Sequence, residues 1–502
     1  MKNLAKLLGL VALGVTLPQA ACNDPLTVKT PDIVPPTVLN DTSALATLRA
    51  GAIGDFSIAY TGDHPDGSGG TAEGVILYGG LLADEFIDSE TFPTRIEVDA
   101  RTIHLTNSDV DLWYRLLHRA RNSAEIAADA YRRLRPGDPG NPEVLNLAGF
   151  TYVFFAETFC SGVPVSHLNA DGTITYGTPL TTVALLDTAI ARFDSAISLA
   201  KALDSTGFLA SVRTEMIQLG TIGKARALLF RAGRPGGQAG DLAAAAALAA
   251  TVPTAFAYSQ EHTTTTDREN NGVFNAGATD SRYSISDSVA NPKTAADSAT
   301  RSREGINGFP FLQPDSIQDP RTPMQLDPGI HGFDGSTPLW DNLRYGSRTS
   351  PITVATGVEA RLIEAEQSLA AGDFPGFLAH LNEPRANPAE RSYFNPNPVD
   401  RTNPATAAIG PLANLTAADT VNAGGAVSLL FAERARWLWL TAHRLGDLRR
   451  LIVQHGKTQD QVFPVGPYFK GQPPTYGVDV NLPVPVTEQN NPNFTACLDR
   501  LP

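Results

Sequence analysis

The chain contains, at residues 433–450, the run Glu433-Arg-Ala-Arg-Trp-Leu-Trp-Leu-Thr-Ala-His-Arg-Leu-Gly-Asp-Leu-Arg-Arg450. Its apolar residues recur with the period of a helix, and the pattern predicts one long helix over about Ala426 to Gln454. Asp447 lies among several arginines, so we expect it to form structural ion pairs with them. Two proline-containing segments follow at a distance, Leu482-Pro-Val-Pro485 and Asn491-Pro-Asn493.

Helical periodicity also dominates the first half of the chain. Short connections rich in Gly and Pro separate the periodic runs, which is typical of stacked helical hairpins and suggests a tetratricopeptide-like scaffold without a clean internal repeat. We expect helices at 44–60, about 112–135, 143–159, 182–203, 211–232, 241–250 and 358–371.

The region from about 251 to 352 has few periodic runs and is rich in Ser, Thr, Asp, Asn, Gly and Pro. Loops this long are uncommon in compact domains and usually have a function or are disordered. We therefore divide the chain into a signal peptide (1–21), a tether (22–40) and a single domain (41–502). The domain has a helical N-terminal part (about 41–250), a loop-rich part (about 251–352) and a C-terminal helical part (about 353–502).

Four segments together resemble the SusD/RagB family of outer-membrane lipoproteins, which capture nutrients for TonB-dependent transporters. The resemblance covers nearly the whole mature chain in order and spacing. The chain departs from the family pattern at Trp437, where a second Glu is usual, and at Thr441-Ala442, where Glu-Gly is usual. Both departures fall in the expected last helix. The segments are 433–450, Asp111-Leu-Trp-Tyr-Arg-Leu-Leu-His-Arg-Ala-Arg-Asn122, Phe154-Phe-Ala-Glu-Thr-Phe-Cys-Ser-Gly-Val-Pro164, and Glu359-Ala-Arg-Leu-Ile-Glu-Ala-Glu366 with Ala371-Gly-Asp373.

This resemblance implies a mainly α fold in which tetratricopeptide-like hairpins pack beside a long, loop-rich region that faces the ligand. It also implies a partner, a SusC-like TonB-dependent barrel that the protein covers as a lid. Ligands in the family are mostly oligosaccharides and sometimes peptides. Binding residues differ too much among members to be transferred position by position.

The N-terminus predicts export and anchoring. Lys2 and Lys6 precede an apolar stretch, Leu7 to Leu17, that is too short to span a bilayer. The following Gln19-Ala20-Ala21-Cys22 resembles a bacterial lipobox, although Leu is usual where Gln19 stands. Cys22 would then carry the lipid that holds the protein at the outer membrane, on the cell surface. Ordinary signal cleavage is the alternative.

The formal charge argues against one class of ligand, and the cysteine content indicates which kinds of site the chain can form. The formal charge is −13 (39 basic against 52 acidic residues), which argues against nucleic acid and other polyanions as ligands. With Cys22 lipidated, Cys160 and Cys497 remain, either as a disulfide or as two buried thiols. No cysteine or histidine cluster has metal-ligand spacing, and we expect neither a metal nor a cofactor.

Candidate ligand-binding residues come from the loop-rich region. An aromatic ring offers an apolar face to the C–H side of a pyranose, while Asp, Asn and Arg bind its hydroxyls. These residues serve either as a ligand surface or as plugs that anchor the loop to the helical body. The candidates are Phe333, Asp334, Trp340, Asn342, Arg344 and Tyr345.

We expect a binding protein and not an enzyme, because no catalytic motif is present and the adjacent acids Asp84 and Glu85 are a weak basis for a glycosidase dyad. The leading hypothesis is a lipoprotein that binds an oligosaccharide and delivers it to the transporter. The alternative is a tetratricopeptide-like envelope scaffold without a small ligand. An exported hydrolase is a third.

Overall fold

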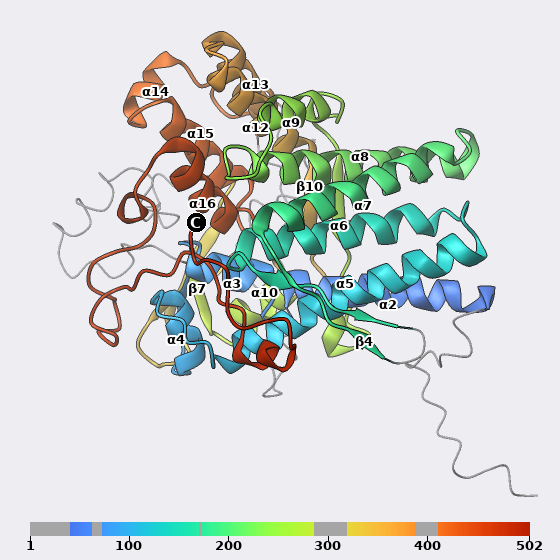
Figure 1. The fold of residues 1–502 in the computed structure, drawn as a ribbon. Coiled ribbons are helices and arrows are strands. Elements are labelled where there is room, and N and C mark those ends of the chain that lie inside the picture. Colours follow the sequence, from blue (N-terminus) through green and yellow to red (C-terminus); the bar gives the residue numbers. More distant parts are fainter. Residues whose placement is uncertain (1–40, 63–72, 170–172, 286–318, 387–409) are drawn as a thin grey trace, which may run out of the picture.

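The computed structural model describes residues 41–62, 73–169, 173–285, 319–386 and 410–502. The expected signal peptide, Cys22 and the tether lie outside these residues. Helices dominate the described part of the chain, as predicted for the fold class (Figure 1). None of these helices combines the length and the apolar character that a bilayer span requires.

The helices that the sequence predicts agree with the expected ranges to within a few residues, except at the C-terminal end. Asn107 caps α5, where its side chain accepts hydrogen bonds from the backbone of Asp109 and Val110. Helices α3, α4, α10, α13 and α14 were not predicted. The helices are α2 (Leu45–Thr61), α3 (Val75–Leu82), α4 (Pro93–Asp99), α5 (Ser108–Leu134), α6 (Gly140–Thr158), α7 (Thr182–Ala202), α8 (Gly207–Arg231), α9 (Asp241–Ala249), α10 (Gly272–Phe274), α12 (Gly357–Ala370), α13 (Phe374–Ala386), α14 (Ala417–Asn422), α15 (Ala426–Trp437) and α16 (Arg444–His455).

Helices α5 to α9 pack against one another in chain order, and α12 packs against α13, so the expected helical hairpins are present (Figure 1). Small residues let α6 and α8 approach α7 closely. The ring of Phe193 in α7 fills the space in front of Gly149 and Gly223, where an added Cβ would lie 2.6 and 2.4 Å from it. Any larger residue at either glycine would push α7 away.

The loop-rich part forms short antiparallel strand pairs in the described residues. The pair β1–β7 aligns Asp88 with Tyr283 and so joins the N-terminal part to the middle region. The strands are β1 (Phe86–Asp88), β2 (Val163–Pro164), β3 (His167–Leu168), β4 (Ile174–Thr175), β5 (Pro179–Leu180), β6 (Ala257–Gln260), β7 (Tyr283–Ile285), β8 (Met324–His331), β9 (Pro338–Asn342) and β10 (Ile352–Thr356).

The prediction of one helix over 426–454 is wrong. The chain leaves the helix after Trp437 and re-enters it at Arg444, and we call residues 438–443 the 438–443 break. Leu440 and Ala442 have left-handed backbone angles, with φ of 54° and 61°. Glycine adopts this conformation most readily, and here alanine adopts it at residue 442. The Thr441-Ala442 departure therefore lies in a turn and not in a helix.

Side chains from distant parts of the chain bind the backbone of the 438–443 break. The backbone carbonyl of Ala442 accepts from Arg226 Nη2 at 2.6 Å, and that of Thr441 accepts from Tyr60 Oη at 3.2 Å. The backbone N–H of Leu440 donates to Glu85 Oε1 at 2.8 Å. These partners come from α8, α2 and the turn before β1. They satisfy peptide groups that the helix would otherwise have paired internally.

The arginine-rich stretch forms a buried ion network, as predicted for Asp447. Asp447 accepts from Arg434 at 2.8 Å and from Arg450 at 2.9 Å, and Arg450 also binds Glu366 of α12. His455 lies 3.3 Å from the same carboxylate. All but His455 are almost fully buried, so the network fixes α12, α15 and α16 relative to one another.

A disulfide joins Cys160, which follows α6, to Cys497 in the C-terminal tail. The sequence alone did not decide whether these two cysteines form a disulfide or remain as two buried thiols. The tail also pairs with the Cys160 turn through the backbone, because Leu498 N donates to Ser161 O at 2.8 Å. The bridge therefore ties the last residues of the chain to the end of a core helix.

We expect Glu366→Gln to destabilise the protein at neutral pH by about 3 kcal/mol, because it leaves Arg450 partly uncompensated in the interior. Burial alone would raise the pKa of Glu366, but Arg450 and the hydrogen bond from His455 lower it to about 2. The ionised carboxylate thus favours the folded state above the ordinary pKa of 4.5, and this contribution disappears as the pH falls toward 2. Urea unfolding of both proteins between pH 2 and 7 measures the difference, which should shrink toward zero in acid. A difference that does not change with pH would contradict this account.

We expect Cys497→Ser to lower the melting temperature of the oxidised protein. In the chain-entropy model a bridge across 337 residues contributes at most on the order of 5 kcal/mol. Cys497 is the better position to change, because Cys160 is buried and can remain as a free thiol. Scanning calorimetry with and without reductant checks the effect. Reductant should lower the melting temperature of the wild type to that of the variant and leave the melting temperature of the variant unchanged.

Candidate functional site

Two exposed phenylalanines lie side by side where the loop before α4 meets the turn between β8 and β9. Phe92 and Phe333 are 45% and 53% exposed, and their rings lie 6.3 Å apart at 22°. Pro93 at the start of α4 follows Phe92, which keeps an extended backbone. Two large apolar rings that share one surface and face solvent are unusual enough to indicate a binding role.

Backbone hydrogen bonds hold the turn that carries Phe333. Phe333 N donates to Ser281 O at 2.8 Å, and Asp334 N donates to Ser89 O at 3.0 Å. Gly335 completes the turn with a φ of +70°, a conformation that suits glycine. The ring of Phe333 thus rests on two segments that the β1–β7 pair has already brought together.

Arg282 lies against both rings. Its guanidinium carbon is 4.7 Å from the centre of the Phe333 ring and 5.3 Å from that of Phe92. The same group donates to Glu90 Oε2 at 2.6 Å. Arg282 therefore supports the phenylalanine pair through cation–π contacts, while Glu90 compensates its charge.

A pocket of about 500 Å³ adjoins the phenylalanine pair. Asp334 accepts hydrogen bonds from the Ser336 and Thr337 backbone and from the Thr337 hydroxyl, and it lies 3.2 Å from Lys470 Nζ. Burial tends to raise the pKa of Asp334, but these hydrogen bonds and Lys470 outweigh it and lower that pKa. Asp334 is therefore an ionised group of the pocket wall whose oxygens are largely engaged by these donors. Its lining residues are Glu90, Thr91, Ile96, Asp334, Ser336, Thr337, Phe469 and Lys470.

The structure separates the six residues selected from the sequence. Phe333 and Asp334 lie on this surface, whereas Trp340 is half-buried against the core. The other three, Asn342, Arg344 and Tyr345, are buried.

Two of these buried residues bind the 438–443 break. Arg344 Nη1 donates to the backbone carbonyl of Trp439, and Tyr345 Oη donates to that of Leu440 at 2.9 Å. Asn342 Oδ1 accepts from Tyr345 N at 3.1 Å. Their positions are those of anchors that fix the middle region to the helical body.

Sequence reasoning missed Phe92, Arg282 and Lys470. Phe92 satisfies the same criterion that selected Phe333, an aromatic residue inside a polar loop, here Ser89-Glu-Thr-Phe-Pro-Thr94. Arg282 and Lys470 carry no comparable signal, because their place at the site depends on strand pairing and on the course of the C-terminal tail.

The acidic pair Asp84 and Glu85 is engaged in the interior. Asp84 accepts two hydrogen bonds of 2.7 Å from Arg444, and Glu85 binds the backbone of Leu440. Burial raises the pKa of Glu85 to about 8, although the hydrogen bond from Leu440 opposes the shift. Both carboxyl groups hold the fold together. Among the described residues, no group of three or more His, Cys, Asp or Glu side chains is arranged to hold a metal ion.

Comparison with known proteins places this geometry in context. No protein-family model and no curated protein matches the chain. Several solved structures, however, have a similar fold. A SusD/RagB family protein from Bacteroides thetaiotaomicron has a TM-score of 0.60 at 11% identity, over 89% of this chain and 94% of the other. The surface glycan-binding protein A from Bacteroides uniformis has a TM-score of 0.57 at 11% identity, over 91% and 99%. A laminarin-binding SusD-like protein has a TM-score of 0.55 at 12% identity, over 91% and 99%. The chain therefore has the fold of the SusD/RagB proteins, which confirms the architecture that the sequence resemblance predicts.

Proposed function

We propose that the protein binds a glycan at the surface formed by Phe92, Phe333 and the adjoining pocket. The exposed phenylalanine pair carries this proposal. One pyranose ring would stack its C–H face on the rings, and its hydroxyls would exchange hydrogen bonds with the exposed hydroxyl of Ser336 beside Asp334. Two proteins of the same fold are described as glycan-binding and laminarin-binding, which supports a sugar as the ligand.

Local charge favours a neutral glycan. Arg282 is paired with Glu90, and Lys470 with Asp88 and Asp334, so neither cation is left to attract an anionic sugar. The chain as a whole carries −13. Sulfated or uronate-rich polymers would meet net repulsion on approach.

We further propose that the protein is an outer-membrane lipoprotein anchored through Cys22, and that it passes its ligand to a SusC-like TonB-dependent transporter. The lipobox-like segment before Cys22 and the SusD/RagB fold support this role. In this role the protein captures its ligand and does not cleave it. The alternative is an envelope scaffold without a small ligand.

We expect Phe333→Ala to weaken glycan binding at least about tenfold, because it removes half of the stacking surface. The melting temperature should change little, since the ring is 53% exposed. Calorimetric titration with neutral glucans, laminarin among them, and with a peptide pool measures the effect.

A matched control is Phe208→Ala, which removes a phenylalanine that is 79% exposed at the start of α8. The glycan affinity of this variant should equal that of the wild type. Glycan affinity that stays within about twofold in both Phe333→Ala and Phe92→Ala would remove the pair from the site. Binding of peptides but of no glycan would overturn the sugar assignment.

We expect the native protein to co-purify from outer membranes with a large TonB-dependent barrel in near-equal amount. Gentle detergent extraction followed by affinity capture and mass spectrometry tests this. A Cys22→Ala variant serves as the control and should be lost from the membrane fraction. Recovery of other envelope proteins without a barrel would favour the scaffold alternative.

A further inference from the structure

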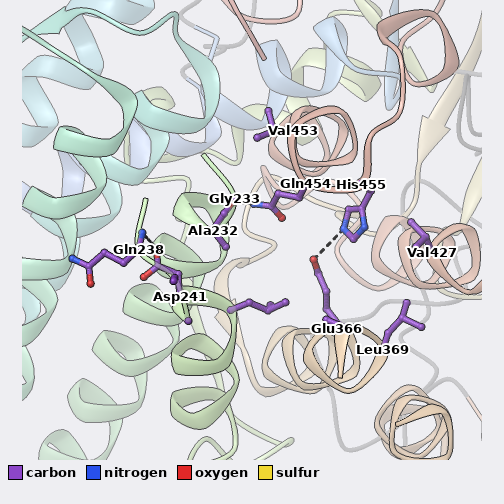
Figure 2. A pocket seen from close by; sticks show the side chains of 14 residues that line it. Ala232, Gly233, Gln238, Asp241, Glu366, Leu369, Val427, Val453, Gln454 and His455 are labelled. Atoms are coloured by element: carbon purple, nitrogen blue, oxygen red, sulfur yellow. Dashed lines mark hydrogen bonds and ion pairs between the residues drawn. The ribbon is translucent and has the colours of Figure 1, made fainter. Parts of the chain in front are cut away.

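A second cavity, of about 530 Å³, lies between the helical hairpins and the C-terminal helices (Figure 2). Its size falls in the range of small-molecule sites. The walls come from the connection between α8 and α9, from the start of α9, and from α12, α15 and α16.

Two polar side chains in the wall are already paired. Asp241 accepts from Arg231 at 2.7 and 2.9 Å, and it also accepts from the backbone of Gln238. Gln454 Nε2 donates to two backbone carbonyls at 2.7 and 2.8 Å, and its Oε1 accepts from Arg450. A ligand would therefore meet mainly the aliphatic groups of Leu242, Leu369, Val427 and Val453, and it would need an apolar body.

His455 also lines the cavity, together with two further polar side chains, the exposed Gln238 and the buried Glu366. His455 Nε2 lies 3.3 Å from Glu366 Oε1, and Figure 2 shows the two side chains pointing toward each other. Because the carboxylate accepts, Nε2 carries the proton in the neutral ring and Nδ1 is left as an acceptor. Nδ1 has no hydrogen-bond partner among the described residues, while the ring packs edge-on against Phe431 at 5.2 Å. Glu366 and Phe431 thus hold the ring in place beside the aliphatic wall.

We propose that this cavity binds a compact, mainly apolar molecule with a hydroxyl group, such as a phenol, whose hydroxyl donates to His455 Nδ1. Glu366 is a positioning residue that sets the tautomer of His455. No residue lines both this cavity and the pocket beside Phe92 and Phe333, so this site is separate from the proposed glycan surface.

The test uses two probes of similar size, 2-naphthol, which has a hydroxyl donor, and 2-methoxynaphthalene, which does not. Fluorescence titration and saturation-transfer NMR measure their binding to the purified wild-type protein. We expect saturable binding of one molecule per chain, with 2-naphthol at least about tenfold tighter because only it satisfies the acceptor. His455→Phe keeps an aromatic ring and should reduce the affinity for 2-naphthol to that for the methyl ether.

A second variant tests the cavity itself. Ala370 lies exposed in the cavity wall, so Ala370→Trp should exclude both probes without loss of the fold, as judged by circular dichroism and melting temperature. Glycan binding should be unchanged in both variants. Failure of the wild type to bind either probe, or full retention of both probes by Ala370→Trp, would overturn the site. Equal affinities of the wild type for the two probes would overturn the role of His455.

Discussion

The arrangement of the whole molecule depends on a buried helix break. Between α15 and α16 the chain leaves helical geometry at residues 438–443, in the interior, where unpaired peptide groups are costly. Tyr60, Glu85 and Arg226 supply the missing hydrogen bonds, and Arg344 and Tyr345 add two more. Four distant segments must therefore meet at this turn. The ion network of Asp447 then holds the two helices on either side of it.

This constraint explains which residues of the loop-rich region are buried and which lie at the surface. Because Arg344 and Tyr345 bind the break, the residues directly after β9 are buried, whereas the turn before β9 lies at the surface. That turn carries Phe333 and Asp334. The same polar and aromatic residue types thus serve as anchors at 342–345 and as a solvent-facing surface at 333–334. Burial separates the two roles, and residue type alone does not.

The proposed glycan surface collects residues from four distant stretches of the chain. Phe92, Arg282, Phe333 and Lys470 meet there because β1 pairs with β7 and the C-terminal tail returns beside α4. The second cavity is likewise a product of assembly, since it forms where α8 and α9 meet α12, α15 and α16. Binding of a sugar at the first site and of an apolar ligand in the second cavity would require no shared residue.

The sequence by itself determined the helical hairpins, the family-like architecture, the Asp447 ion pairs and the presence of an aromatic loop, because helical periodicity and charge spacing are local properties. It also allowed the Cys160–Cys497 pairing without deciding it. Only the tertiary structure decided that the helix over 426–454 breaks. Leu438, Trp439 and Leu440 are apolar and compatible with a helix, and the partners that make the break favourable lie up to 381 residues away. For the same reason only the structure paired Phe333 with Phe92: contacts between distant segments depend on packing, which local patterns do not record.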